Sequence, residues 1–171
     1  IKLPFIQRVR NKLINSLLNN VISNNILILI KKDGLIKTWK NNWENAKFDK
    51  SKSLQENVGC SNLPEILKYV DLTHSLFKNF IRENVPEKAR VLDIGCGTGL
   101  YLNDFSDNYN LTGIDINMSY IDAAITLVPK AKYLCGSFLT TNVPNQYELI
   151  YSFSVFMYFE RSSLPPFFDK I

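Results

Sequence analysis

A short glycine-rich stretch, VLDIGCGTGLYL at residues 91–102, constrains the fold of this chain more than any other part of the sequence. It starts as an apolar run typical of a buried strand and continues with three glycines at alternate positions, Gly95, Gly97 and Gly99. Glycine permits a sharp turn and lets the backbone approach a ligand closely. A helix that begins after such a turn presents unpaired N–H groups. The stretch therefore predicts a strand–turn–helix unit that binds a ligand at the turn.

The residues after Pro86 alternate between strand-like and helix-like patterns. Short apolar runs predict strands, and longer amphipathic stretches predict the helices between them. We expect strands at 90–95, 110–116, 132–138 and 147–154, and helices at 99–107 and 119–128. Strands that are separated by helices of this length form a parallel sheet. The expected fold is therefore α/β, a Rossmann-like doubly wound parallel sheet.

The chain divides into an N-terminal extension, residues 1–61, and a core, residues 62–171. In the extension, apolar residues at steps of three and four predict a helix over 3–22. An Asp-Gly pair between two apolar runs predicts a hairpin near 26–39. We therefore expect a mainly helical extension in front of the sheet.

A polar stretch with aromatic residues, residues 39–60, joins the extension to the core. It contains Trp39, Trp43 and Phe48, and we expect a loop with one short helix. Its aromatic side chains would either cover a bound ligand or anchor the extension on the core. The next helix, expected near 63–82, begins with a capping-box pattern.

The charge of the chain is unevenly distributed around its net value of +4. Residues 1–50 hold 10 Lys and Arg against 3 Asp and Glu, whereas the remainder holds 10 against 13. The basic end allows peripheral membrane contact through residues 1–22, although a solvated face of lysines explains the same charge and is favoured. Basic and aromatic residues are not interleaved as in proteins that stack bases, which disfavours a nucleic-acid partner.

Cysteine usage and hydropathy indicate the compartment. The three cysteines include no CxxC pair, and the chain has one histidine, which argues against a disulfide framework or a metal site. The longest apolar run, ILILI, is too short to span a bilayer, and the sequence shows no secretory signal pattern. We therefore expect a cytoplasmic protein without a bound metal.

An acidic residue at the end of each of the first two strands of the core indicates the ligand class. Asp115 comes twenty residues after Gly95, where a carboxylate can accept hydrogen bonds from the two hydroxyls of a ribose. The dinucleotide pattern G-x-G-x-x-G fails, because its third small residue would fall on Leu100. Asp93 would also repel a pyrophosphate, whereas it suits an ammonium group. An adenosine joined to an amino acid is S-adenosylmethionine.

Four blocks of the sequence resemble the class I S-adenosylmethionine-dependent methyltransferases. VLDIGCGTG resembles their first motif and LTGIDINMSYIDAA their second, while AKYLCGSF and YELIYSFSVFMYF are similar to the third and fourth. The blocks follow one another in the family's order and cover roughly residues 87–160. A weaker match, LQENVG at residues 54–59, resembles a stretch upstream of the core in some bacterial small-molecule methyltransferases.

The resemblance implies a role for each matching residue. Asp93 would hold the ammonium group of the methionine part, and Asp115 would take the ribose hydroxyls. The other cofactor-binding residues that it implies are Gly95, Cys96, Gly97, Thr98 and Gly99 along the methionine part, Ile116, Ser137 and Phe138 around the adenine, and Ser152 at the methionine end. The family often carries an acidic residue where Ser137 stands, and a serine accepts a hydrogen bond more weakly than a carboxylate.

The family's reaction is methyl transfer, and we expect it here to an O or N atom of a small organic acceptor. A base is required only if the acceptor must lose a proton first. The candidates are Tyr158, Glu160 and His74, none of which the sequence marks as catalytic. Two alternatives stay open: a non-catalytic remnant that binds S-adenosylmethionine, and an NAD-dependent oxidoreductase.

The sequence predicts fewer strands than the resembled family has. The family's sheet has seven strands, and only four are predicted here. The fourth strand would then form an exposed edge of the sheet. We therefore expect a fragment of a longer protein in preference to a chain that pairs with a second copy, and the sequence does not give the oligomeric state.

Overall fold

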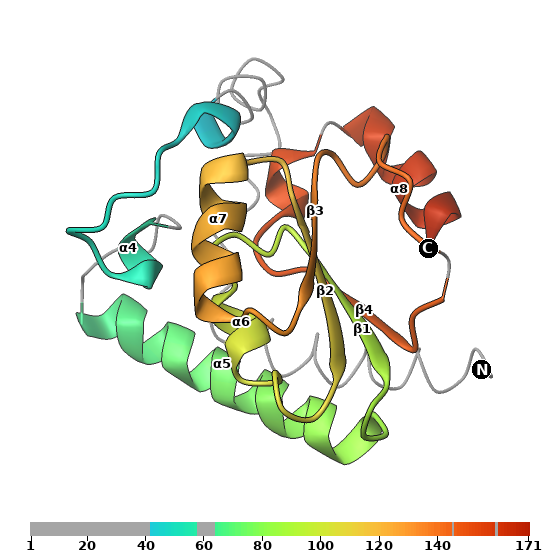
Figure 1. Cartoon of the computed structure of the whole chain (residues 1–171), viewed down its shortest axis with the longest axis horizontal. Helices are drawn as coiled ribbons and strands as arrows, with labels where there is room; N and C mark the ends of the chain where they lie inside the picture. Colours follow the sequence, from blue (N-terminus) through green and yellow to red (C-terminus); the bar gives the residue numbers. More distant parts are fainter. Residues whose placement is uncertain (1–41, 58–63, 145, 160) are drawn as a thin grey trace.

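The computed structural model describes residues 42–57, 64–144, 146–159 and 161–171, and Figure 1 shows their arrangement. The helix expected over 3–22 and the hairpin expected near 26–39 lie outside these residues, as does the proposed domain boundary after residue 61. The described elements form a sheet with helices on both of its faces. This confirms the α/β class predicted from the alternating pattern.

The sheet has four parallel strands in the order β3-β2-β1-β4. The strands are β1 (Arg90–Ile94), β2 (Asn110–Asp115), β3 (Lys132–Cys135) and β4 (Leu149–Tyr151). On one side of β1 lie β2 and then β3, in sequence order. Strand β4 pairs with the other side of β1. The strand order therefore reverses between β1 and β4, which is where open α/β sheets bind their ligands.

The helices expected near 63–82, 99–107 and 119–128 are present, with some differences in length. They are α4 (Leu54–Asn57), α5 (Pro64–Asn84), α6 (Leu100–Asn103), α7 (Met118–Leu127) and α8 (Leu164–Lys170), and two short 3₁₀ helices are η1 (Phe156–Tyr158) and η2 (Arg161–Ser163). Helix α6 is shorter than the expected 99–107, because the Phe105 N–H already bonds to the Leu102 carbonyl three residues back. Strand β4 ends at Tyr151, shortly before Ser154 takes a positive φ of 56°.

Two hydrophobic clusters pack on the two faces of the sheet. Val91 of β1 belongs to the cluster that contains Ile81 of α5 and Leu102 of α6, whereas Leu92 belongs to the cluster that contains Phe167 of α8. Successive residues of a strand point to opposite faces, so a run of apolar residues in β1 supplies both clusters. Burial on both faces explains why Val91, Leu92 and Ile94 are all apolar.

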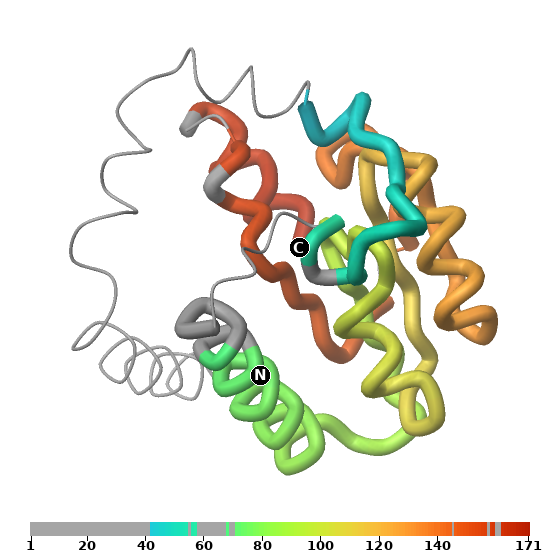
Figure 2. The backbone as a smooth tube through the Cα atoms, turned by 90° about the vertical axis from the view of Figure 1, so that its left-hand side faces the viewer, coloured from blue at the N-terminus to red at the C-terminus, as the bar shows by residue number. Residues whose placement is uncertain are grey.

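The segment before α5 lies against α7, and we call its described residues 42–57 the arm. In Figure 2 the arm, drawn in cyan to teal, passes beside the orange α7. The arm includes a helical turn at 42–45 and α4. Its hydrogen bonds to the first turn of α7 place it at the carboxyl edge of the sheet.

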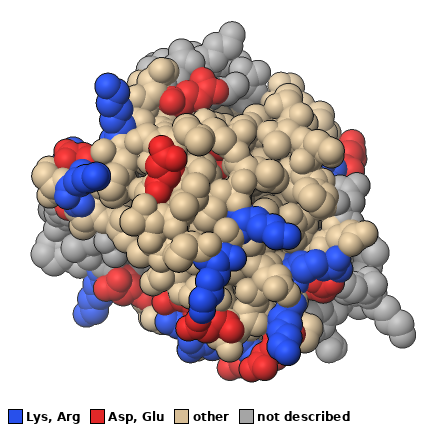
Figure 3. Space-filling view, in the orientation of Figure 1, with Lys and Arg blue, Asp and Glu red and all other residues tan. Residues whose placement is uncertain are grey.

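The described surface has a mixed charge on the face shown in Figure 3. Basic and acidic side chains lie interspersed, and uncharged residues cover much of the middle. This face therefore lacks the single-sign stripe that tracks a nucleic-acid backbone. Among the helices of the described residues, none combines the length and the apolar character needed to cross a bilayer.

Candidate functional site

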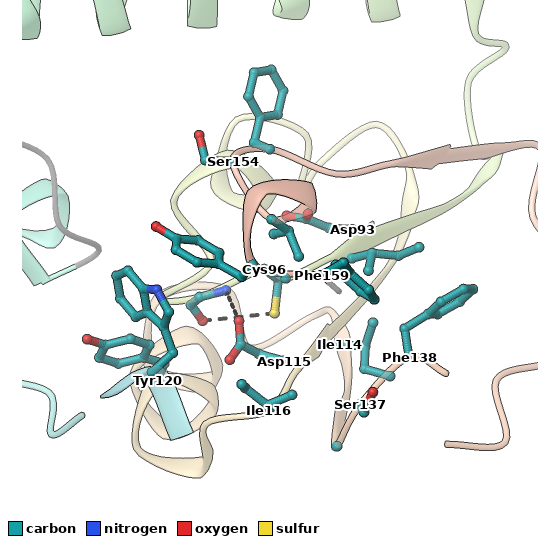
Figure 4. Close-up of a pocket in the computed structure, with 18 of the residues that line it drawn as sticks. Asp93, Cys96, Ile114, Asp115, Ile116, Tyr120, Ser137, Phe138, Ser154 and Phe159 are labelled. Atoms are coloured by element: carbon teal, nitrogen blue, oxygen red, sulfur yellow. Dashed lines mark hydrogen bonds between the residues drawn. The ribbon is translucent and has the colours of Figure 1, made fainter. Parts of the chain in front are cut away.

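A cavity of about 410 Å³ opens at the carboxyl ends of β1 and β2. It lies at the point where the strand order reverses. Figure 4 shows Asp93 and Asp115 in it, with Tyr120 on one side and Phe138 on the other. Its lining comes from the arm, the glycine turn, the ends of β1 and β2, α7, the segment after β3 and the segment after β4.

The glycine turn after β1 forms one wall of this cavity. Gly95, Gly97 and Gly99 have φ values of 78°, 51° and 78°, a region that residues with a side chain rarely adopt. The N–H groups of Gly95 and Cys96 both donate to the Ile114 carbonyl, at 2.7 and 3.1 Å. These two bonds hold the turn against the end of β2, so the local sequence and the neighbouring strand together fix its shape.

Asp93 is a buried carboxyl group in the cavity wall. The residue is 2% exposed, and its pKa is raised to about 8, mainly by burial and to a smaller extent by the nearby charge of Asp115. The adjacent Tyr151 of β4 lowers the pKa only in part. Among the described residues that line the cavity there is no Lys, Arg or His. A cation brought by a ligand would therefore stabilise the ionised form of Asp93.

The Asp115 carboxylate is held in a fixed orientation at the end of β2. One oxygen, Oδ2, accepts the Gly97 N–H at 2.9 Å, and Oδ1 accepts the Asn117 N–H at 2.9 Å. Burial raises the pKa of Asp115, and these two backbone hydrogen bonds oppose the rise. Since each carboxylate oxygen has further lone pairs, the group can still accept hydrogen bonds from a diol.

Most of the cofactor-binding residues expected from the sequence lie around this cavity. Those that line it are Asp93, Gly95, Cys96, Gly97, Thr98, Asp115, Ile116, Ser137 and Phe138. Gly99 and Ser152 are not part of the lining. Gly99 packs against Ala124 of α7, and the Ser152 hydroxyl donates to the Ile94 carbonyl at 2.8 Å. Next to Ser152, the residues after β4 that line the cavity are Phe153, Ser154 and Val155.

Two of the three candidate bases, Tyr158 and His74, lie among the described residues. Tyr158 lines the cavity, and its ring packs edge-on against Trp43 with centroids 5.7 Å apart. His74 of α5 is outside the lining, with Nε2 2.7 Å from a carboxylate oxygen of Asp104, and burial lowers its pKa. Glu160 lies outside the described residues. A catalytic role for any of them stays a prediction.

An aromatic wall in the cavity was not predicted as a unit. It consists of Trp43, Tyr101, Tyr120, Phe153, Tyr158 and Phe159. These residues come from four separate segments, so no local spacing connects them. The sequence left open whether Trp43 covers a ligand or anchors the extension. In the structure it lines the cavity and also packs edge-on against Tyr120, with centroids 6.1 Å apart.

Known proteins with a similar sequence are methyltransferases. Residues 91–171 match the family model described as a methyltransferase domain. Over 100 residues the chain is 26% identical to protein 235L of Invertebrate iridescent virus 6, whose name describes it as a methyltransferase. That match covers 56% of this chain and 38% of the relative.

Two solved structures share the fold. One is a TehB-like SAM-dependent methyltransferase from Corynebacterium glutamicum, with a TM-score of 0.51, 19% identity, and coverage of 81% of this chain and 66% of that one. The other is the plantazolicin methyltransferase BpumL in complex with a triazolic desmethylPZN analogue and SAH, with a TM-score of 0.57 and 24% identity. It is covered over 56% of its length, and this chain over 85%.

The matched family and the site agree. Residues 91–171 match the methyltransferase domain family, and the parallel sheet, the glycine turn and the acidic end of β2 agree with the class I S-adenosylmethionine-dependent methyltransferases that the sequence resembles. The chain spans 38% of the curated relative and 56–66% of the two solved structures.

Proposed function

We propose that this chain binds S-adenosylmethionine in the cavity and supports methyl transfer to an O or N atom of a small organic acceptor. The observation that carries the proposal is the pair of carboxyl groups in the cavity. Asp93 is buried there and Asp115 is partly buried, and the described lining supplies no basic side chain to pair with them. A ligand that brings its own positive charge and a ribose fits this donor and acceptor set.

Each residue has a defined part in this proposal. Asp93, once ionised, holds the ammonium group, and the oriented Asp115 carboxylate accepts the ribose hydroxyls. Ile116 and Phe138 offer apolar contacts on the two sides of an adenine, and Ser137 supplies a hydroxyl. The bound cofactor supplies a methyl group that is already activated by a sulfonium. The chain's own residues then align the reactants and exclude water.

The aromatic wall supports the choice of a small organic acceptor. Tyr101 stacks on Phe153 with ring centroids 4.4 Å apart and an interplanar angle of 6°, and both rings line the cavity. Flat apolar faces of this kind bind organic molecules through dispersion and burial. The cytoplasmic location and the membrane contact of residues 1–22 stay predictions from the sequence.

Calorimetric titration of the chain with S-adenosylhomocysteine tests the proposal, with NAD titrated in parallel. We expect binding of the former alone, and at least a tenfold loss of affinity in Asp115→Ala, because the ribose loses its acceptor. Asp122→Ala, at an exposed position of α7, is the matched control and should bind normally. Binding of NAD in place of S-adenosylhomocysteine, or equal affinity in Asp115→Ala, would contradict the proposal.

A further inference from the structure

Asn117 stands out as a buried amide whose polar groups all have partners. The residue is 1% exposed. Its backbone N–H donates to Asp115 Oδ1 at 2.9 Å, and its side-chain oxygen accepts the Tyr120 N–H at 3.2 Å. Its side-chain nitrogen donates to the carbonyls of Trp43 and Ala46, at 2.6 and 2.7 Å. One residue thus connects the acidic strand end, the start of α7 and the arm.

The two hydrogen bonds donated by the Asn117 side-chain nitrogen are not required for capping a helix. Asn117 is the N-cap of α7, and capping requires only a side-chain oxygen that accepts an N–H of the first turn. Ser, Thr or Asp would cap equally well. The amide nitrogen is what distinguishes Asn, and both of its bonds go to the arm, 71 and 74 residues away in sequence. The choice of Asn is therefore explained by the arm and not by the cap.

Two further hydrogen bonds between α7 and the segment before α5 also come from the first turn of the helix. The Ser119 hydroxyl accepts the Phe48 N–H at 2.8 Å, and the Tyr120 hydroxyl donates to the Asn57 carbonyl at 2.6 Å. The Asn57 side chain in turn bonds to the backbone of Asp49 at 2.7 and 2.9 Å. The arm is thus fixed at its middle and far end, and Asn117 fixes its beginning.

Trp43 is the residue through which the arm reaches the cavity. Its indole N–H is buried without a hydrogen-bond partner among the described residues, so no hydrogen bond of the side chain to these residues holds the ring. The ring packs edge-on against both Tyr120 of α7 and Tyr158 of η1, and all three residues line the cavity. The backbone bonds from Asn117 therefore set where this part of the wall lies.

We propose that Asn117 is a positioning residue, which holds Trp43 in the cavity wall and connects it to Asp115, so that the arm is part of the binding site. Through its N–H, Asn117 orients the carboxylate that takes the ribose. Through its amide, it places the indole ring against the same ligand. This inference rests on the proposed function, because the ligand that contacts Trp43 is the cofactor bound at Asp115.

The first test uses the protein without ligand. The chain has two tryptophans, so Trp39→Phe leaves Trp43 as the single fluorescent reporter. In this background Asn117→Ser keeps a capping hydroxyl and removes both bonds to the arm. We expect acrylamide to quench Trp43 about twofold more strongly in the double variant, because the arm opens locally. Asn142→Ser, at an exposed position, is the matched control and should leave quenching unchanged.

The second test titrates the same proteins with S-adenosylhomocysteine. In the Trp39→Phe protein, binding should change the Trp43 emission. In the Asn117→Ser variant the affinity should fall about tenfold and the emission change should disappear. Unchanged quenching together with unchanged affinity in this variant overturns the inference. Absence of binding by the folded Trp39→Phe protein would instead overturn the proposed function, and the quenching experiment would still decide whether Asn117 holds Trp43.

A variant in the arm covers the case in which Asn117→Ser fails to fold. Trp43→Ala removes the ring from the cavity wall and leaves both hydrophobic clusters of the sheet intact, since Trp43 belongs to neither. We expect it to lose affinity for S-adenosylhomocysteine by about tenfold, while Trp43→Phe loses less because it keeps an aromatic ring. Wild-type affinity in Trp43→Ala would overturn the inference.

Discussion

Asp93 shows how one residue connects the stability of this domain to its ligand. A carboxyl group with a pKa near 8 is largely protonated at neutral pH in the ligand-free protein. A bound cation lowers that pKa, because it favours the ionised form. The site thus gains its negative charge mainly when the ligand arrives.

Binding should therefore release a proton. Between about pH 6 and pH 8 we expect the affinity for S-adenosylhomocysteine to rise with pH, because Asp93 must ionise to hold the ammonium group. Calorimetry at pH 7 in two buffers of different ionisation enthalpy measures the number of protons released, which should approach one. Asp93→Asn should bind more weakly and release none. An affinity that does not change over this pH range would exclude the linkage.

The same residue should make the ligand-free protein less stable at higher pH. The pKa of Asp93 is about 8 in the folded state against 3.8 for the ordinary group, so the folded state keeps a proton that the unfolded state has lost. The free energy of unfolding is therefore highest below the ordinary pKa and falls as the pH rises toward 8. We expect Asp93→Asn to have the higher melting temperature at pH 8, with a smaller gain at pH 5. Asp122→Asn serves as the control, and a gain that is equal at both values would contradict the assignment.

The contact between α6 and α7 depends on the absence of a side chain at Gly99. This residue is the N-cap of α6 with φ of 78°, and a Cβ atom placed there would lie 3.1 Å from the Cβ of Ala124. The first helix after the glycine turn can therefore approach the second closely. Gly99 does not line the cavity, so the structure gives it a packing role.

Substitution of Gly99 should affect stability. We expect Gly99→Ala to lower the free energy of unfolding by about 1–2 kcal/mol from backbone strain alone, with an additional cost from the close contact with Ala124. Urea unfolding measures the change, and Asn103→Ala at an exposed position of the same helix provides the comparison. A variant as stable as the wild type would show that α6 shifts to accommodate the methyl group.

At the scale of the whole molecule, we expect the protection of backbone amides against hydrogen exchange to decrease from the centre of the sheet outward. Strand β1 pairs on both sides, and Val91, Leu92 and Ile94 are at most 2% exposed. Strands β3 and β4 each have a partner on one side within the described sheet. The arm is attached through a few hydrogen bonds to the start of α7.

Hydrogen exchange followed by mass spectrometry tests this order. We expect the amides of β1 to exchange slowest, those of β3 and β4 faster, and those of the arm fastest among these segments. Addition of S-adenosylhomocysteine should slow exchange in the glycine turn and in the arm. Arm peptides that exchange as slowly as β1 would indicate that the arm belongs to the cooperative core.

Much of the fold and half of the site could be predicted because their signals are local. The helix expected near 63–82 appears as Pro64–Asn84, since its capping residues and apolar stripe lie within one segment. The four strands appear in the expected parallel sheet. The glycine turn and Asp115 come together because the carboxyl ends of neighbouring parallel strands meet at one edge of the sheet. The prediction was less exact at single positions. Gly99 and Ser152 were expected to contact the ligand, but the residues next to them in sequence line the cavity instead.

By itself, the sequence determined the α/β class, the turn after the first strand and the two acidic positions on which the proposed ligand chemistry rests. These follow from backbone preferences and from the alternation of strands and helices, which act over a few residues. Only the tertiary structure decided that Trp43 lines the cavity and that Asn117 holds the arm. Their hydrogen bond joins residues 74 apart in sequence, and it forms only after the sheet has brought the first turn of α7 and the arm to the same edge.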